Sequence, residues 1–103
     1  MENIKVIFRK SRNPYTGKWE LEAYFPEFCA RYGYIQLYAD CAGGGWCDAS
    51  TEFYQTTKKA TPDEYLALLD KLRTEFLENG IYLVVRQRMD WNDLRNKAWK
   101  RVV

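Results

Sequence analysis

The chain has 103 residues, the size of one small domain that can bury a single core without disulfide bonds. It has no run of about 18 apolar residues and no basic start followed by an apolar segment, so the sequence predicts neither a membrane span nor a signal peptide. The formal net charge is only +2, and three cysteines without an export signal indicate free thiols in the cytoplasm.

Histidine is absent from the chain, which removes the commonest general base and metal ligand. Catalysis by a Ser/His/Asp or Cys/His arrangement is therefore excluded within this chain. Cys29, Cys41 and Cys47 form no C-x-x-C pair, and a structural zinc site would need Asp40 or Asp48 as its fourth ligand. We expect no enzyme, no cofactor and no metal, and we expect the cysteines to be buried or partly exposed thiols.

The N-terminal part predicts a β-hairpin. Alternate residues of Ile4–Phe8 are apolar, and turn residues follow them. Over residues 18–25 apolar and polar residues alternate, which predicts a strand with Trp19 on its buried face. Glu20 and Glu22 are then expected on the opposite, solvated face.

Four further elements are predicted around the longest helix. Alternation over residues 34–40 indicates a third strand, and the glycine-rich residues 41–50 indicate a loop. A short additional strand is predicted over residues 52–57. Residues 81–88 predict a strand that is apolar on both faces at its start, which favours a central position. Residues 90–103 predict a short C-terminal helix with basic residues near its end.

The clearest pattern in the sequence is a helix that begins after Thr61 and ends at Gly80. Thr61 and Glu64 have the spacing of a capping box, and Pro62 stands where a helix can spare an N–H. Gly80 can adopt the left-handed conformation that ends a helix. The apolar stripe with helical spacing comprises Tyr65, Leu68, Leu69, Leu72 and Phe76.

Together these elements predict a single α+β domain over residues 1–103. It consists of an antiparallel sheet of three to five strands, in the order β-β-β-(β)-α-β, with one long helix packed on one face and a short C-terminal helix. The predicted inward-facing residues are Val6, Phe8, Trp19, Leu21, Ala23, Phe25, Leu37, Leu69, Leu72, Phe76, Leu83 and Val85.

Five segments of the chain resemble a family of small uncharacterised proteins encoded by bacteriophages and conjugative elements. They are VIFRK at 6–10, AYFPE at 23–27, the glycine-rich loop at 43–50, ATPDEY at 60–65 and NGIYLVVRQR at 79–88. The loop departs from the family, because GGGWCDAS stands where the family often has G-Q-x-G-A-A. The resemblance implies a mobile-element setting and no particular activity.

Several aromatic residues are predicted at the surface. Tyrosines fall on the polar faces of predicted strands, and Trp46 stands in the glycine-rich loop. Interfaces between proteins favour such residues. The sequence therefore favours a non-enzymatic accessory protein that binds a host or phage protein through Tyr24, Tyr38, Trp46 and Tyr54. The alternatives are stacking of the tyrosines on single-stranded nucleic acid, cross-strand aromatic pairing and, for Trp46, packing back on the core.

Basic residues concentrate in two segments, 1–18 and 86–103, each with a net charge of +4. If these segments meet in the fold, they form one basic surface, although ordinary solubility charge explains them equally well. The sequence contains no recognised nucleic-acid-binding motif. An open sheet edge with exposed aromatics would also allow a homodimer. The alternative function is weak nucleic-acid binding through Lys5, Arg9, Lys10, Arg86, Arg88, Lys97, Lys100 and Arg101.

Overall fold

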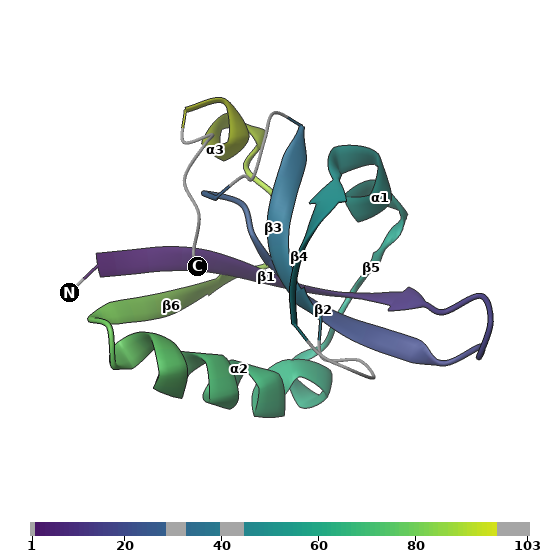
Figure 1. Cartoon of the computed structure of the whole chain (residues 1–103), viewed down its shortest axis with the longest axis horizontal. Helices are drawn as coiled ribbons and strands as arrows, with labels where there is room; N and C mark the ends of the chain where they lie inside the picture. The colour runs from purple at the N-terminus through teal and green to yellow at the C-terminus, as the bar shows by residue number, and fades with distance from the viewer. Residues whose placement is uncertain (1, 29–32, 40–44, 97–103) are drawn as a thin grey trace.

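The structure is a computed structural model that describes residues 2–28, 33–39 and 45–96. Within these ranges a six-stranded sheet carries one long helix, α2 (Pro62–Leu77), on one face. Two short helices, α1 (Thr51–Thr56) and α3 (Trp91–Asn96), lie on the other face (Figure 1). The predicted α+β fold is therefore confirmed. No helix in these ranges has both the length and the apolar character needed to cross a membrane.

The first strand is the centre of the sheet. At Ile7 it pairs with Tyr24 on one side and with Arg86 on the other, so its two edges carry different neighbours. All strand pairs are antiparallel except that of the first and last strands, which run parallel. The predicted N-terminal hairpin is present. The strands are β1 (Glu2–Arg12), β2 (Trp19–Phe25), β3 (Tyr34–Ala39), β4 (Gly45–Ser50), β5 (Lys58–Lys59) and β6 (Ile81–Arg86), in the order β4-β3-β2-β1-β5, with β6 also paired to β1.

Both faces of the sheet are covered, so the domain has two cores. Val6 and Phe8 of β1 enter the core beneath α2, whereas Ile7 between them enters the core beneath α1 (Figure 1). The prediction of one inward-facing set is correct for the α2 side, but it is wrong for Leu37, which lies in the other core. It is also wrong for Trp19, which is 48% exposed because α2 does not reach that end of the hairpin.

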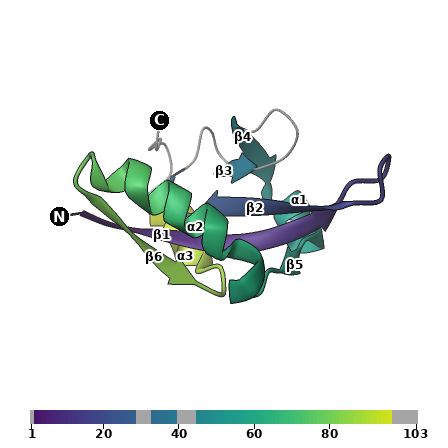
Figure 2. The same cartoon turned by 90° about the horizontal axis from the view of Figure 1, so that it is seen from below.

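Helix α2 begins and ends where its sequence predicts. The Glu64 carboxylate reaches back to accept hydrogen bonds from the Thr61 N–H at 2.9 Å and from its hydroxyl at 3.0 Å. Gly80 has a φ of 73°, the left-handed conformation that lets the chain turn directly into β6. Figure 2 shows α2 lying across β1 and β6. Its stripe of Leu68, Leu69, Leu72 and Phe76 is buried, as predicted.

Two segments before α2 differ from the prediction. Residues 52–57 were expected to form a strand, but Thr51–Thr56 is helix α1. The cause is Ser50, whose hydroxyl accepts a hydrogen bond from Phe53 N at 3.1 Å and so starts a helical turn. The loop expected over residues 41–50 is also wrong for its second half, because Gly45–Ser50 is β4, paired along its length with β3. Residues 40–44 lie outside the described ranges.

The strand β6 is at an edge, which contradicts the predicted central position. Among the described residues it pairs only with β1. Its apolar character has another cause: Leu83 is fully buried beneath α2, and Val84 and Val85 are half-buried. Arg73 of α2 covers part of the open edge, since its Nη2 donates to the Leu83 carbonyl at 3.2 Å.

The predicted C-terminal helix is present as α3 up to Asn96, and its remainder lies outside the described residues. Asp90 starts the helix by accepting a hydrogen bond on its carboxylate from Asn92 N at 3.0 Å.

Replacing Leu72 by alanine tests the α2 core. Leu72 is fully buried, so Leu72→Ala should lower the free energy of unfolding by about 2–5 kcal/mol through lost burial and a new cavity. Urea denaturation followed by circular dichroism measures this. Leu66→Ala, on the exposed side of the same helix, is the control and should cost less than about 0.5 kcal/mol. Equal stability of the two variants would contradict the assigned helix face.

Candidate functional site

Two of the four predicted interface residues lie in the interior. Tyr24 is fully buried and Tyr54 nearly so, and their rings meet edge to face with centroids 5.0 Å apart. Burial raises the pKa of Tyr24, and the carboxylate of Glu22, which accepts a hydrogen bond from its hydroxyl at 3.1 Å, raises it further. In this conformation neither phenol offers a surface to a partner.

The other two predicted interface residues pack against α2. The Trp46 ring is 5.3 Å from the Phe25 ring and 6.0 Å from the Phe76 ring, measured between centroids. Tyr38 meets the Trp46 ring edge to face at 5.4 Å, and Lys71 of α2 donates to its hydroxyl at 2.6 Å. Both side chains are half-buried. Trp46 was expected either to contact a partner or to pack back on the core, and in the structure the indole packs on the core.

The two basic segments meet where β1 and β6 pair, but several of their charges are already engaged. Lys5 Nζ lies 3.0 Å from the Asp93 carboxylate. Arg9 donates to the Thr57 carbonyl at 2.6 Å and to its hydroxyl at 2.9 Å. Arg86, by contrast, is exposed. Within the described part of these segments, the Lys5 charge is thus paired with an acid and Arg9 is turned towards Thr57.

The remaining members of the predicted basic patch lie apart from these. Arg88 is exposed just beyond β6. Lys97, Lys100 and Arg101 lie outside the described residues.

A different concentration of cations and aromatic rings lies on the β1–β2 hairpin and the adjoining β5. The hairpin projects beyond the start of α2, which leaves its outer end uncovered (Figure 1). No acidic residue occurs between residues 3 and 19 of the sequence. We call this area the hairpin surface; it comprises Lys10, Arg12, Tyr15, Lys18, Trp19, Lys58 and Lys59.

The tip of the hairpin is an ordered turn. The Asn13 side-chain carbonyl accepts hydrogen bonds from the N–H groups of Tyr15 at 2.8 Å and Thr16 at 3.2 Å, and Asn13 N donates to the Lys18 carbonyl at 2.8 Å. Gly17 has a φ of 72°, which closes the turn. These bonds hold Tyr15 outward, where it is 95% exposed.

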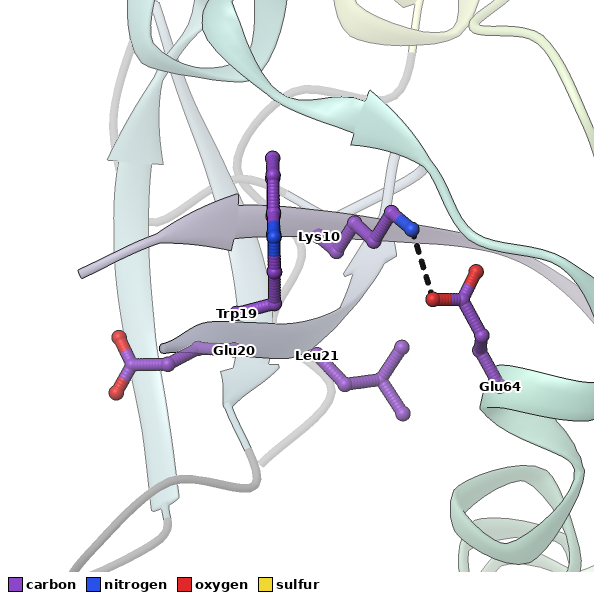
Figure 3. A pocket seen from close by; sticks show the side chains of 5 residues that line it. All are labelled: Lys10, Trp19, Glu20, Leu21 and Glu64. Atoms are coloured by element: carbon purple, nitrogen blue, oxygen red, sulfur yellow. Dashed lines mark hydrogen bonds and ion pairs between the residues drawn. The ribbon is translucent and has the colours of Figure 1, made fainter. Parts of the chain in front are cut away.

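Trp19 is the centre of the hairpin surface. The Nζ atoms of Lys10 and Lys58 lie 5.3 Å and 5.5 Å from the centre of its ring, within the range of cation–π attraction. The strand register explains this: Arg12 pairs with Trp19 and Lys10 with Lys58, and paired residues share a face of the sheet. Figure 3 shows the indole edge-on with Lys10 to one side. Beside it is a shallow cavity of about 260 Å³.

The cap of α2 forms the wall of this cavity (Figure 3). Lys10 Nζ lies 2.7 Å from the Glu64 carboxylate. This bond, together with the hydrogen bond from Thr61 N, lowers the pKa of Glu64 to about 2. One lysine is thus placed between an aromatic ring and a helix-capping carboxylate.

The environment of Glu22 differs from the one that the sequence indicated. Glu22 was expected on a solvated face, but it is only 7% exposed because α1 covers that face of the sheet. Burial raises the pKa of Glu22, and hydrogen bonds from Ser11 and Tyr24 oppose this shift.

Cys47 on β4 is an exposed cysteine that forms no disulfide, whereas Cys29 and Cys41 lie outside the described residues. Among the residues that the structure describes, no group of three or more His, Cys, Asp or Glu side chains is arranged to hold a metal ion.

Comparison of the chain with protein-family models, curated proteins and solved structures finds no match. The resemblance to phage and conjugative-element proteins therefore stays a prediction, and the function is argued from the site itself.

The packing of Trp46 predicts a stability effect. Trp46→Ala should lower the free energy of unfolding by about 3 kcal/mol, since truncating core aromatic residues costs about 3–5 kcal/mol and this ring is half-buried. Trp19→Ala is the matched control, because its ring is outside both cores, and it should cost under about 1 kcal/mol. Chemical denaturation measures both. A larger loss for Trp19→Ala would mean that the roles of the two indoles are reversed.

The low pKa of Glu64 predicts a pH-dependent contribution to stability. Its folded-state pKa of about 2 is below its ordinary value of 4.5, so the ionised form stabilises the fold above pH 4.5 and the effect disappears as the pH falls towards 2. Glu64→Gln keeps a side chain that can cap the helix and removes only the charge. The parent should be the more stable protein at pH 6, and the difference should shrink steadily as the pH is lowered to about 2. A difference that does not change with pH would contradict the assignment.

Proposed function

We propose that this domain is a non-enzymatic protein that binds single-stranded nucleic acid through the hairpin surface. The observation that carries the proposal is the environment of Trp19. Its large aromatic side chain is 48% exposed, and Lys10 and Lys58 lie within 5.5 Å of the ring centre.

The hairpin surface has both components that single-stranded nucleic acid requires. An exposed indole provides a face on which an unpaired base can stack, and this is largely independent of base identity. Lys58 beside the ring can contact a phosphate next to that base, whereas Lys10 is already paired with Glu64. Tyr15, held outward by the turn, is a second aromatic ring on the same hairpin.

Single strands fit this surface better than duplexes do. Bases within a duplex are already stacked on one another, so an exposed indole gains little from them.

The protein-binding hypothesis has less support, because its aromatic residues are used within the fold. Tyr24 and Tyr54 are buried, and Trp46 and Tyr38 pack against α2. We therefore prefer the alternative function of the sequence analysis, nucleic-acid binding, and place it on the hairpin surface instead of the basic patch predicted from the sequence. A mobile-element setting, in which single-stranded DNA or RNA is exposed during transfer or replication, is consistent with this class.

Fluorescence anisotropy with labelled single-stranded DNA and RNA of about ten nucleotides tests the proposal at about 50 and 200 mM salt. Parent binding should weaken steeply with salt. Trp19→Ala should weaken binding about 5- to 150-fold, because stacking on one aromatic ring contributes about 1–3 kcal/mol per base. Trp19→Phe should restore part of the affinity. Replacing Lys58 and Lys59 with glutamine should reduce the slope of log affinity against log salt by about 0.7 for each phosphate that the variant no longer neutralises.

The chain offers a matched control. Tyr82 on β6 is also an exposed aromatic residue with a cation over its ring, Arg73 at 4.9 Å, and it lies outside the hairpin surface. Tyr82→Ala should leave the affinity within about twofold. A double reversal of Arg86 and Arg88 to glutamate tests the patch predicted from the sequence. Affinity that is unchanged in Trp19→Ala, or equal competition by polyglutamate, would overturn the proposal.

A further inference from the structure

A second cavity lies on the opposite side of the sheet from α2. It has a volume of about 360 Å³, within the size range of small-molecule sites. Three strands and a helix contribute to it: Glu22 from β2, Leu37 and Ala39 from β3, Cys47, Asp48, Ala49 and Ser50 from β4, and Phe53 from α1. This cavity shares no residue with the hairpin surface.

The register of the sheet explains the hollow. Ala39 pairs with Glu22 on one side, and Leu37 pairs with Cys47 on the other, so these residues share one face of three adjacent strands. Alanine at positions 39 and 49 leaves space above the sheet that larger strand residues would fill. Phe53, 42% exposed, stands beside this space. The result is a mostly apolar hollow with two carboxylates in its lining, the buried one of Glu22 and the exposed one of Asp48.

The Glu22 carboxylate is held by hydroxyl groups rather than by a cation. Glu22 is 7% exposed, and its two oxygens accept hydrogen bonds from the Ser11 hydroxyl at 3.0 Å and the Tyr24 hydroxyl at 3.1 Å. Within the described residues, no lysine or arginine forms an ion pair with it. Arg9, its partner across the strands, is directed instead to Thr57 and the Tyr54 ring.

An uncompensated buried carboxylate is costly to the fold. The Ser11 and Tyr24 hydroxyls occupy one acceptor position on each oxygen, and a carboxylate has about four such positions. Glu22 can therefore accept further hydrogen bonds from a group that enters the cavity. A ligand cation would satisfy these positions and neutralise the buried charge at once.

We propose that this cavity binds a small organic amine. The ammonium group donates hydrogen bonds to the Glu22 carboxylate, and the apolar body of the ligand lies on Leu37, Ala39 and Ala49 beside Phe53. A neutral ligand of the same shape would lack the charge-assisted hydrogen bonds, and an anionic one would be repelled, so the site selects for positive charge.

Nuclear magnetic resonance titration of the full chain at pH 7 tests this proposal. The probes are phenethylamine and n-butylamine, and the neutral counterpart is 2-phenylethanol. We expect saturable shifts of the backbone amides of Ala39, Cys47 and Ala49 with the amines, and at least tenfold weaker binding of the alcohol.

Three variants assign the effect to the cavity. Glu22→Gln should keep the fold, because it removes a buried charge and can still bond to Ser11 and Tyr24, and it should weaken amine binding about 10- to 100-fold. Glu20→Gln removes a nearby carboxylate that does not line the cavity and should change amine binding less than about twofold. Ala39→Val fills the floor and should abolish binding of phenethylamine with Glu22 in place.

Three results would overturn the proposal. They are equal binding of the amine and the alcohol, amine affinity that Glu22→Gln leaves unchanged, and the absence of any saturable shift up to about 20 mM amine, beyond the millimolar range in which small ligands are detected. Circular dichroism melting of each variant checks that a loss of binding does not come from unfolding.

Discussion

The domain depends on the pairing of β1 on both of its edges. β2 pairs with one edge, while β6 and β5 pair with successive parts of the other. The side chains of the same strand alternate between the two cores, with Val6 beneath α2 and Ile7 beneath α1. β1 therefore has strand partners at both edges and a hydrophobic core on each of its two faces. Its pairing positions β2, β5 and β6 directly, and its side chains contribute to both cores.

Elements that are determined by residues close together in the sequence could be predicted from the sequence. The cap at Thr61 and Glu64, the exit at Gly80 and the alternation in the N-terminal hairpin all depend on residues within a few positions of one another. The α+β class follows from these. The tertiary arrangement was harder to predict from the sequence. Helix α1 was predicted as a strand, whereas one capping residue, Ser50, outweighs the strand-forming residues that follow it. The apolar residues of β6 likewise indicated strands on both sides, whereas they are apolar because α2 covers one face of this edge strand.

The candidate sites were less predictable, since burial decides them and alternation cannot show which face of a sheet is covered. Trp19 and Trp46 are the same residue type on neighbouring parts of the sheet. Trp46 lies beneath α2 and is part of the core, whereas Trp19 lies beyond the start of α2 and is exposed. Glu22 shows the same effect in reverse, because α1, which was predicted as a strand, covers its face. Knowledge of helix lengths and positions was needed for all three.

The parallel pairing of β1 with β6 has a consequence for how the protein is made. β1 leaves the ribosome before β6, which follows only after β2 to β5 and α2 have been synthesised. Until then one edge of the Glu2–Ile7 segment has no partner strand, and the core beneath α2 lacks Leu83. The hairpin of β1 and β2 can form early because its strands are close in sequence, but the sheet closes late. During this interval the nascent chain exposes an unpaired strand edge and apolar side chains. Such surfaces are prone to aggregation and are bound by chaperones.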